Sequence, residues 1–299
     1  MENQVTLEYL GAASIASGSA KLISGARRGV RHLALPSGGP VDPPSAAFAN
    51  ELLGNPPGQP LIEVPLVGGT WRIQGDCRIA LTGADMHWEI DGQPVAPGTA
   101  RDLRDSNTLV GRAARSAVFA YFALNGRWSK EILSSRELLL GGNIKIGKSW
   151  SSNLLACVDG AVKQQFTAPG PGPVYDMTSP INVYPGPEWT WLSPTRREGL
   201  LTARYEISTQ SNRQGLRLLP QPNTPNSYRD HASELLQMIS SPVLPGTVQL
   251  TPAGPIILGP DAHTVGGYPR ILMLAPGELA RVYQFGFRRA FAFHLQDFY

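Results

Sequence analysis

The chain has 299 residues, of which 42% are hydrophobic and 16% are charged, and its formal net charge is +3. This length allows one large or two medium domains, and the small, dispersed positive charge argues against a nucleic-acid-binding surface. No apolar run approaches the roughly 18 residues of a membrane helix, and the first residues, with Glu2, do not resemble a secretory signal. We therefore expect a cytoplasmic protein that binds neither membranes nor nucleic acids.

Short apolar runs separated by turn residues dominate the sequence. The 32 Gly and 27 Pro residues are scattered between runs such as "TWRIQG", "MHWEIDG", "AVFAYFAL" and "PIILGP". Runs of this length, rich in β-branched and aromatic residues, are typical of antiparallel strands. Only two segments favour helices: residues 42–54, where Asp42 is a suitable N-cap, and residues 230–240, where Asp230 is. The sequence predicts a mainly β protein.

A Pro- and Gly-rich connection, "QFTAPGPGPVYDMTSPINVYPGP", follows the strand-like runs of the first half. We place a domain boundary within it, which gives an N-terminal half over residues 1–175 and a C-terminal half over residues 176–299. Each half reads as a β-barrel-like domain with little helix.

Residues 142–149, "GNIKIGKS", match the pattern of a phosphate-binding P-loop. However, Ile144 and Ile146 are β-branched and suit a strand better than a tight phosphate-binding turn. A hairpin strand with an exposed lysine is the favoured interpretation. The five histidines are widely spaced and the cysteines are not clustered, so we expect no metal site. Cys77 and Cys157 lie in apolar contexts and are expected to be reduced, buried thiols.

Three segments carry candidate functional groups, each with a structural alternative. The segment "RRGVRHLALPSGGPVD" either presents Arg27 and backbone amides to an anion or simply turns into a helix capped by Asp42. In "STQSNRQGLRLL", arginines on both sides of a glycine could bind a carboxylate or a carbonate-like group, or belong to a solvated turn. In "DAHTVGGYPR", Asp261, His263 and Thr264 could supply proton transfer and hydrogen bonds beside a closely approaching backbone.

Several segments in order carry a resemblance to one family: "GGPVDPPSAAFANELLGN", "LIEVPLVGG", "ALTGADMHWEIDG", "SSRELLLGG", "STQSNRQGLRLL", "SSPVLPGTVQLTPAGPIIL" and "DAHTVGGYPRI". The chain resembles the biotin-dependent carboxyltransferase-like family, also called allophanate hydrolase subunit 2, KipA or the 5-oxoprolinase C subunit. The resemblance covers about residues 5–295. It implies two cyclophilin-like β-barrel halves with few short helices.

The resemblance also implies a function in a complex. The leading hypothesis is one component of an ATP-dependent 5-oxoprolinase-type amidohydrolase that converts 5-oxoproline to L-glutamate. It would act with a KipI-like partner (the 5-oxoprolinase B subunit) and with a LamB/YcsF-type protein (the A subunit), with ATP as the cofactor of the complex. One alternative is a regulatory KipA-type protein that binds and antagonises a KipI-like kinase inhibitor. Another is carboxyl transfer from carboxybiotin to a urea- or allophanate-like substrate.

Family motifs carried over by position are only partly kept. The Q-D-x-G-R motif falls on residues 23–27, where Ile23 and Ser24 replace the glutamine and the acid, and Arg27 remains. In the S-D-R-M-G motif Asn212 replaces the acid, and His263 stands where glutamine is common. The resemblance implies three catalytic residues, Asp261, His263 and Arg213, and eight substrate-binding residues, Arg27, Asp42, Asn212, Gln249, Thr264, Gly266, Gly267 and Tyr268.

Overall fold

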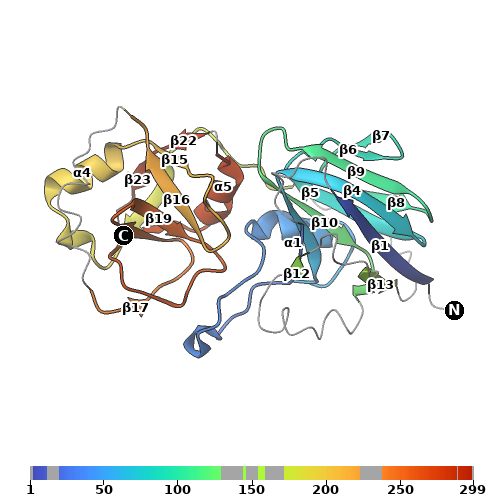
Figure 1. Cartoon of the computed structure of the whole chain (residues 1–299), viewed down its shortest axis with the longest axis horizontal. Coiled ribbons are helices and arrows are strands. Elements are labelled where there is room, and N and C mark those ends of the chain that lie inside the picture. The colour runs from blue at the N-terminus through green and yellow to red at the C-terminus, as the bar shows by residue number, and fades with distance from the viewer. Residues whose placement is uncertain are drawn as a thin grey trace. The chain divides into compact units, whose positions relative to one another are not determined.

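The computed structural model describes residues 3–11, 20–128, 144–145, 154–158, 172–222, 238–287 and 289–297. The chain forms two compact units, drawn in Figure 1. The first comprises Met1–Ala26 and Gly38–Val174, and the second comprises Arg27–Ser37 and Tyr175–Tyr299. The expected boundary at residue 175 put Arg27–Ser37 in the first half, whereas the contacts of this segment, hereafter the arm, group it with the second unit.

Two antiparallel sheets build the first unit. One has the strand order β11 (Arg127–Trp128), β13 (Leu154–Val158), β1 (Asn3–Gly11), β4 (Val67–Gln74), β9 (Thr108–Ala113), β6 (Trp88–Ile90) and β7 (Gln93–Val95). The other has the order β12 (Ile144–Lys145), β2 (Lys21–Ile23), β3 (Leu61–Pro65), β10 (Phe119–Leu124), β5 (Cys77–Gly83) and β8 (Thr99–Leu103). The strand β12 lies within the P-loop-like segment, the rest of which is outside the described residues.

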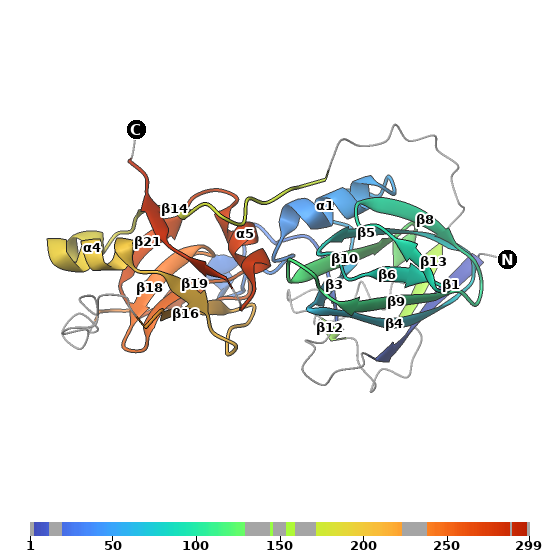
Figure 2. The same cartoon turned by 90° about the horizontal axis from the view of Figure 1, so that it is seen from above.

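The alternation of side chains along β10 explains how the first unit packs. Ala120, Phe122 and Leu124 belong to the main core, which also takes side chains from the other sheet. Tyr121 and Ala123 face the opposite way, into a second core formed with the helix α1 (Pro43–Glu51). Figure 2 shows α1 lying over this sheet near β5 and β10.

The predicted helix at residues 42–54 is confirmed as α1. Asp42 caps it, since Asp42 Oδ1 accepts a hydrogen bond from the backbone N–H of Ser45 at 3.0 Å. The other predicted helix, at residues 230–240, falls mostly on residues 223–237, which lie outside the described part of the chain. No described helix is long and apolar enough to cross a membrane.

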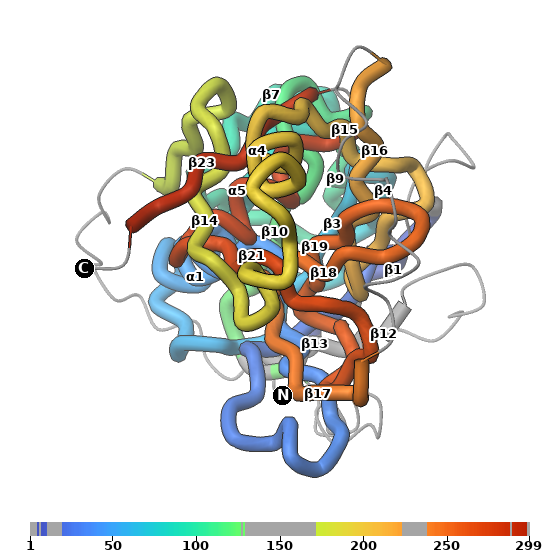
Figure 3. The backbone as a smooth tube through the Cα atoms, turned by 90° about the vertical axis from the view of Figure 1, so that its left-hand side faces the viewer, coloured from blue at the N-terminus to red at the C-terminus, as the bar shows by residue number. Residues whose placement is uncertain are grey.

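One eight-stranded sheet forms the frame of the second unit. Its order is β22 (Ala290–Phe291), β15 (Tyr205–Ile207), β16 (Gly215–Pro220), β19 (Gly254–Leu258), β18 (Thr247–Thr251), β21 (Arg270–Leu274), β14 (Ile181–Pro185) and β23 (Phe293–Leu295). The two strands at the ends of this order, β22 and β23, are separated only by Ala292, so the sheet curls into a nearly closed barrel. In Figure 3 the tube of β23 runs beside β14, its parallel neighbour.

Few helices accompany this barrel. They are α4 (Pro194–Thr202), α5 (Glu278–Phe285) and the single turns η1 (Arg31–Leu33) and η2 (Trp189–Trp191). A short two-stranded sheet, β17 (Ser241–Pro242) with β20 (Val265–Gly266), completes the described elements of the unit. The prediction of a mainly β fold with few short helices is therefore confirmed, with two antiparallel sheets in the first unit and a nearly closed barrel in the second.

Cys77 is a free, buried cysteine at the start of β5. Burial, together with the negative charges of Asp76 and Asp102, raises the pKa of its thiol to about 12. The expectation of a reduced, buried thiol is confirmed for Cys77, and the side chain of Cys157 lies outside the described part of the structure.

Candidate functional site

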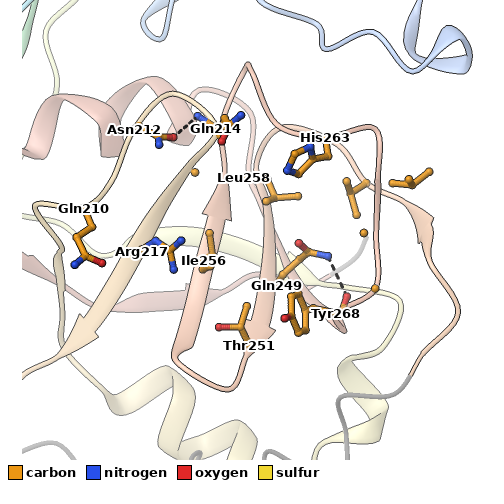
Figure 4. A pocket seen from close by; sticks show the side chains of 15 residues that line it. Gln210, Asn212, Gln214, Arg217, Gln249, Thr251, Ile256, Leu258, His263 and Tyr268 are labelled. Atoms are coloured by element: carbon orange, nitrogen blue, oxygen red, sulfur yellow. Dashed lines mark hydrogen bonds between the residues drawn. The ribbon is translucent and has the colours of Figure 1, made fainter. Parts of the chain in front are cut away.

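A cavity of about 350 Å³ opens in the second unit. Its walls come from residues 210–217 at the start of β16, from the hairpin β18–β19, and from residues 263–268 (Figure 4). Six of the predicted site residues line it: Asn212, Gln249, His263, Gly266, Gly267 and Tyr268. The structure thus brings together residues from three segments that are distant in sequence.

Amide side chains dominate the polar lining of this cavity. Gln210, Asn212, Gln214 and Gln249 contribute amides, and Arg217 contributes a guanidinium. Among the described residues that line the cavity, none carries a carboxylate. An arginine with neutral amides suits a small polar ligand that is neutral or anionic and disfavours a cationic one.

Gln249 is held in one position on β18. Its side chain is buried, and Nε2 donates a hydrogen bond to the carbonyl oxygen of Tyr268 at 3.1 Å. A Cβ atom at Gly266 would lie 2.6 Å from Gln249 Nε2, whereas a Cβ at Gly267 would have no neighbour closer than 3.6 Å. The absence of a side chain at Gly266 therefore leaves room for the Gln249 amide in this position, whereas space does not require a glycine at 267.

Arg213 and Asp261 form a bidentate ion pair. Arg213 Nε lies 2.8 Å from Asp261 Oδ2, and Arg213 Nη2 lies 3.0 Å from Asp261 Oδ1. The backbone N–H of Asp261 also donates to the carbonyl oxygen of Arg213 at 3.1 Å. Neither residue lines the cavity. In this structure the anion bound by the Arg213 fork is Asp261 itself, and the catalytic roles of both residues stay predictions.

Asn212 sits at the tight turn before β16. Its Oδ1 accepts a hydrogen bond from the backbone N–H of Gln214 at 2.8 Å, and its carbonyl oxygen accepts one from the hydroxyl of Tyr283 in α5 at 3.1 Å. The amide that replaces the acid of the family motif therefore also organises the turn, which places Gln214 at the cavity.

Arg27 and Thr264 belong to the second unit but do not line the cavity. Arg27 Nη2 donates to the carbonyl oxygen of Pro36 at 3.0 Å within the arm. Burial lowers the pKa of Arg27, and the negative charge of Asp261 partly offsets this effect, so the two groups are electrostatic neighbours. The carbonyl oxygen of Thr264 accepts a hydrogen bond from the backbone N–H of Val243 at 3.0 Å.

Asp42 belongs to the first unit, whereas the other predicted site residues belong to the second. It is fully buried, caps α1, and donates its backbone N–H to the hydroxyl of Tyr121 at 2.8 Å. These contacts match the structural alternative for this segment, a turn leading into a capped helix. A substrate-binding role for Asp42 stays a prediction.

Arg31, which the sequence did not indicate, anchors the arm to the wall of the cavity. Arg31 Nη2 donates to the carbonyl oxygens of Val243 at 2.7 Å and His263 at 2.8 Å. Arg31 Nη1 lies 3.2 Å from Ser37 Oγ, and burial lowers the pKa of this guanidinium. One side chain therefore fixes two cavity-lining segments through their backbones.

A second ion pair supports the strand beside Gln249. Arg270, the register partner of Gln249 on β21, binds Glu188 through Nη2 at 2.6 Å and Nε at 2.9 Å. Its Nη1 donates to the carbonyl oxygen of Pro242 at 2.8 Å. The hydrogen bonds from Arg270 to the Glu188 carboxylate lower the pKa of Glu188, whose side chain is buried. The pair ties β17 and η2 to the sheet.

Comparison with known proteins identifies relatives over most of the chain. The chain is 28% identical to the C subunit of 5-oxoprolinase from Escherichia coli over 276 residues, which is 87% of this chain and 83% of that protein. It is 27% identical to the C subunit of 5-oxoprolinase from Haemophilus influenzae over 86% of this chain and 82% of that protein. It is 24% identical to urea amidolyase of Saccharomyces cerevisiae over 86% of this chain, but spans only 15% of that protein.

Solved structures share the fold. A crystal structure of TTHA0988 superposes with a TM-score of 0.77 at 23% identity, covering 99% of this chain and 57% of that chain. The Kluyveromyces lactis urea carboxylase gives a TM-score of 0.78 at 19% identity, covering 98% of this chain and 27% of that chain. The chain therefore spans little more than half of one solved structure and about a quarter of the other. Residues 33–295 match the family described as "Carboxyltransferase domain, subdomain A and B", and the chain belongs to that family.

Proposed function

We propose that the chain is the C-type subunit of an ATP-dependent 5-oxoprolinase-type amidohydrolase, which opens 5-oxoproline to L-glutamate. The observation that carries this proposal is the similarity to two proteins named as C subunits of 5-oxoprolinase. In each alignment it extends over more than four fifths of this chain and of the relative. Its partners in the proposed complex are a KipI-like protein and a LamB/YcsF-type protein.

The chemistry of the cavity supports this substrate class. 5-Oxoproline is a small cyclic amide with one carboxylate, and a cavity of about 350 Å³ has the size of a small-molecule site. The amide side chains suit the ring amide, and Arg217 suits the carboxylate. His263 lines the same cavity with an exposed side chain, where its imidazole can exchange a proton with water or with the ring nitrogen that becomes an amine.

Arg213 and Asp261 act in this proposal as positioning residues. Their ion pair and the hydrogen bond from the backbone N–H of Asp261 to the Arg213 carbonyl oxygen hold residues 259–263 against the turn at Asn212. This arrangement fixes the backbone from which the His263 side chain projects. Because the acid of the family motif at position 212 is an amide here, Asn212 supplies hydrogen bonds and no proton transfer.

ATP belongs to the proposed complex rather than to this cavity. Its hydrolysis supplies the free energy that drives ring opening. A nucleoside triphosphate needs several cationic or backbone N–H contacts. The described residues that line the cavity supply one guanidinium, that of Arg217. We therefore assign the nucleotide to another surface of the assembly.

Reconstitution tests the proposal. The chain is co-expressed with its KipI-like and LamB/YcsF-type partners, the complex is purified, and L-glutamate and ADP are measured with 5-oxoproline and ATP. We expect formation of both products to depend on all three chains, and His263→Gln to reduce glutamate formation at least tenfold, a typical loss for a proton-transfer residue. Arg204→Gln, an exposed arginine outside the cavity lining, is the matched control. An assembled complex that forms no glutamate contradicts the proposal.

Carboxyl transfer is the second candidate, because the urea amidolyases align over 86% of this chain. It predicts that activity requires a separate biotin carboxylase and a carboxybiotin carrier, with urea as acceptor. Urea-dependent consumption of carboxybiotin by the chain, without turnover of 5-oxoproline, would favour this alternative.

A further inference from the structure

Three residues form a straight row across the floor of the cavity. Arg217 on β16 is the register partner of Ile256 on β19, and Ile256 is the register partner of Gln249 on β18. All three line the cavity (Figure 4). Neighbouring strands are about 4.8 Å apart, so the two ends of the row are separated by about 10 Å at the backbone. A cationic group and an amide thus flank an apolar side chain at the scale of a small ring.

The Gln249 end of the row presents a fixed donor and acceptor. One hydrogen of Nε2 is used by the carbonyl oxygen of Tyr268 at 3.1 Å, which orients the amide plane. The other hydrogen of Nε2 and the oxygen Oε1 remain for a ligand. None of the described residues donates a hydrogen bond to Oε1, and the absence of a side chain at Gly266 leaves the amide its room.

A cyclic amide is the group that complements such a pair. The ring forces its amide to be cis, so its N–H and C=O point to the same side and can meet Oε1 and Nε2 together. An open-chain secondary amide is trans, and its cis form costs about 2.5–4 kcal/mol, so it presents only one of the two groups at a time. The Gln249 end therefore distinguishes lactams from peptide-like amides.

The Arg217 end is suited to an anion. Its side chain is exposed and forms no ion pair with any described residue, and none of the described lining residues is acidic. A free guanidinium binds a carboxylate through two parallel hydrogen bonds. Ile256, between the two ends, offers an apolar surface for ring methylenes.

The geometry points to the Arg217–Ile256–Gln249 row as the element that selects a lactam bearing a carboxylate. The carboxylate pairs with Arg217, the cis amide pairs with Gln249, and the ring lies over Ile256. This inference rests on the proposed function for the identity of the substrate, 5-oxoproline. It adds that Arg217 recognises the carboxylate and Gln249 recognises the ring amide, and it explains why neutral lactams and open-chain amides bind less tightly.

Four probes separate the contributions of the row in direct binding to the full chain. They are 5-oxoproline, 2-pyrrolidinone, which lacks the carboxylate, cyclopentanecarboxylate, which lacks the amide, and N-acetylglycine, whose amide is trans. Dissociation constants are measured by ligand-observed NMR titration. We expect 5-oxoproline to bind at least about tenfold more tightly than each other probe, since each lacks one charge-assisted or paired hydrogen-bonding contact.

Variants at the two ends of the row are titrated with the same probes, and we expect a crossed pattern, in which each variant weakens only the probes that carry the group its residue binds. Arg217→Gln is expected to weaken 5-oxoproline and cyclopentanecarboxylate by about tenfold or more and to change 2-pyrrolidinone by less than about twofold. Gln249→Met, of similar size, is expected to weaken 5-oxoproline and 2-pyrrolidinone and to spare cyclopentanecarboxylate. Arg204→Gln is the control for a lost surface charge. Because Gln249 is buried, thermal melts accompany each variant, and Arg217→Gln, at an exposed position, tests the row without a packing change.

The inference is overturned if Arg217→Gln weakens the neutral and the anionic probes equally, or if N-acetylglycine binds as tightly as 5-oxoproline. It is also overturned if 5-oxoproline binds neither the full chain nor the reconstituted complex. These outcomes are independent of turnover. A crossed binding pattern in a complex without glutamate formation supports the row and contradicts the proposed function. Glutamate formation without the crossed pattern does the reverse.

Discussion

Arg31 Nη2 lies 2.8 Å from the carbonyl oxygen of His263, a residue 232 positions further along the chain. The same atom donates to the carbonyl oxygen of Val243 at 2.7 Å. A guanidinium that holds two backbone carbonyls defines the spacing of the segments to which they belong. The position of the His263 backbone therefore depends on a residue that does not itself line the cavity.

Replacing Arg31 by glutamine is expected to loosen this wall. Loss of two charge-assisted hydrogen bonds reduces the free energy of unfolding of the second unit by about 1–3 kcal/mol. It also speeds hydrogen exchange of the amides at Val243 and Thr264, as measured by mass spectrometry on native protein. Arg28→Gln, an exposed neighbour in the arm, is the control. Unchanged exchange at Val243 in Arg31→Gln would show that the arm does not support the wall.

The Arg213–Asp261 pair predicts an asymmetric double-mutant cycle. Asp261→Leu removes the counter-charge that Asp261 gives to the buried guanidinium and is expected to cost about 3 kcal/mol, the lower end for buried pairs because the Asp261 side chain keeps 21% exposure. The double variant, which combines Asp261→Leu with Arg213→Leu, is expected to lose less than the sum of the two single variants, since both charges of the pair are removed together. Denaturant unfolding measures all variants, with Glu198→Gln on the exposed surface of α4 as control. Additive single losses would refute the coupling.

The two adjacent glycines are expected to respond differently to alanine. Gly266→Ala places a Cβ 2.6 Å from Gln249 Nε2, which must move although it is buried and hydrogen-bonded. This overpacking costs about 1–3 kcal/mol and weakens ligand binding. Gly267→Ala meets only ordinary contacts, from 3.6 Å outward, and is expected to stay within about 1 kcal/mol of the parent. Thermal unfolding and 5-oxoproline titration report both effects, and equal behaviour of the two variants would contradict this account.

Glu188 predicts an acid-dependent stability. Because hydrogen bonds from Arg270 lower its folded-state pKa, Glu188 binds a proton more readily in the unfolded chain. Its contribution is thus present above the unfolded pKa, about 4.3, and is lost as the pH falls through the lower folded value. Glu188→Gln is expected to be less stable than the parent at pH 7, with a difference that shrinks below about pH 4. Denaturant unfolding between pH 7 and pH 3 measures this, and a pH-independent difference would refute it.

Some structural features could be predicted from residues that are close together in the sequence. Asp42 indicated a helix start because an N-cap acts within three residues, and α1 begins as expected. Residues 261–270 were predicted to bring a closely approaching backbone to a site, and Gly266 meets Gln249 there. The partner of Gly266 is 17 positions away and on another strand, so the glycine was visible in the sequence but its reason was not.

Other features depend on contacts that no local pattern encodes. The sequence predicts that Arg213 binds a carboxylate or carbonate-like group of a ligand, but in the fold it pairs with Asp261, 48 positions away. Arg31 looked like one of several arm arginines, and only the barrel reveals the carbonyls that it binds. The helix α5 was not predicted, because its N-cap is Gly277, which has no side chain to cap the helix, and because its buried residues include the polar Glu278, Arg281 and Gln284.

The arm has a consequence for how the protein is made. Its residues leave the ribosome more than 200 positions before Val243 and His263, the residues whose carbonyls Arg31 binds. During synthesis Arg31 therefore lacks these two carbonyl partners while the sheets of the first unit are translated. Contacts of such long sequence separation form late and slow folding. The second unit therefore acquires its full set of contacts only near the end of synthesis, and a fragment starting at Tyr175 would lack Arg31 and the clamp that it forms on the second unit.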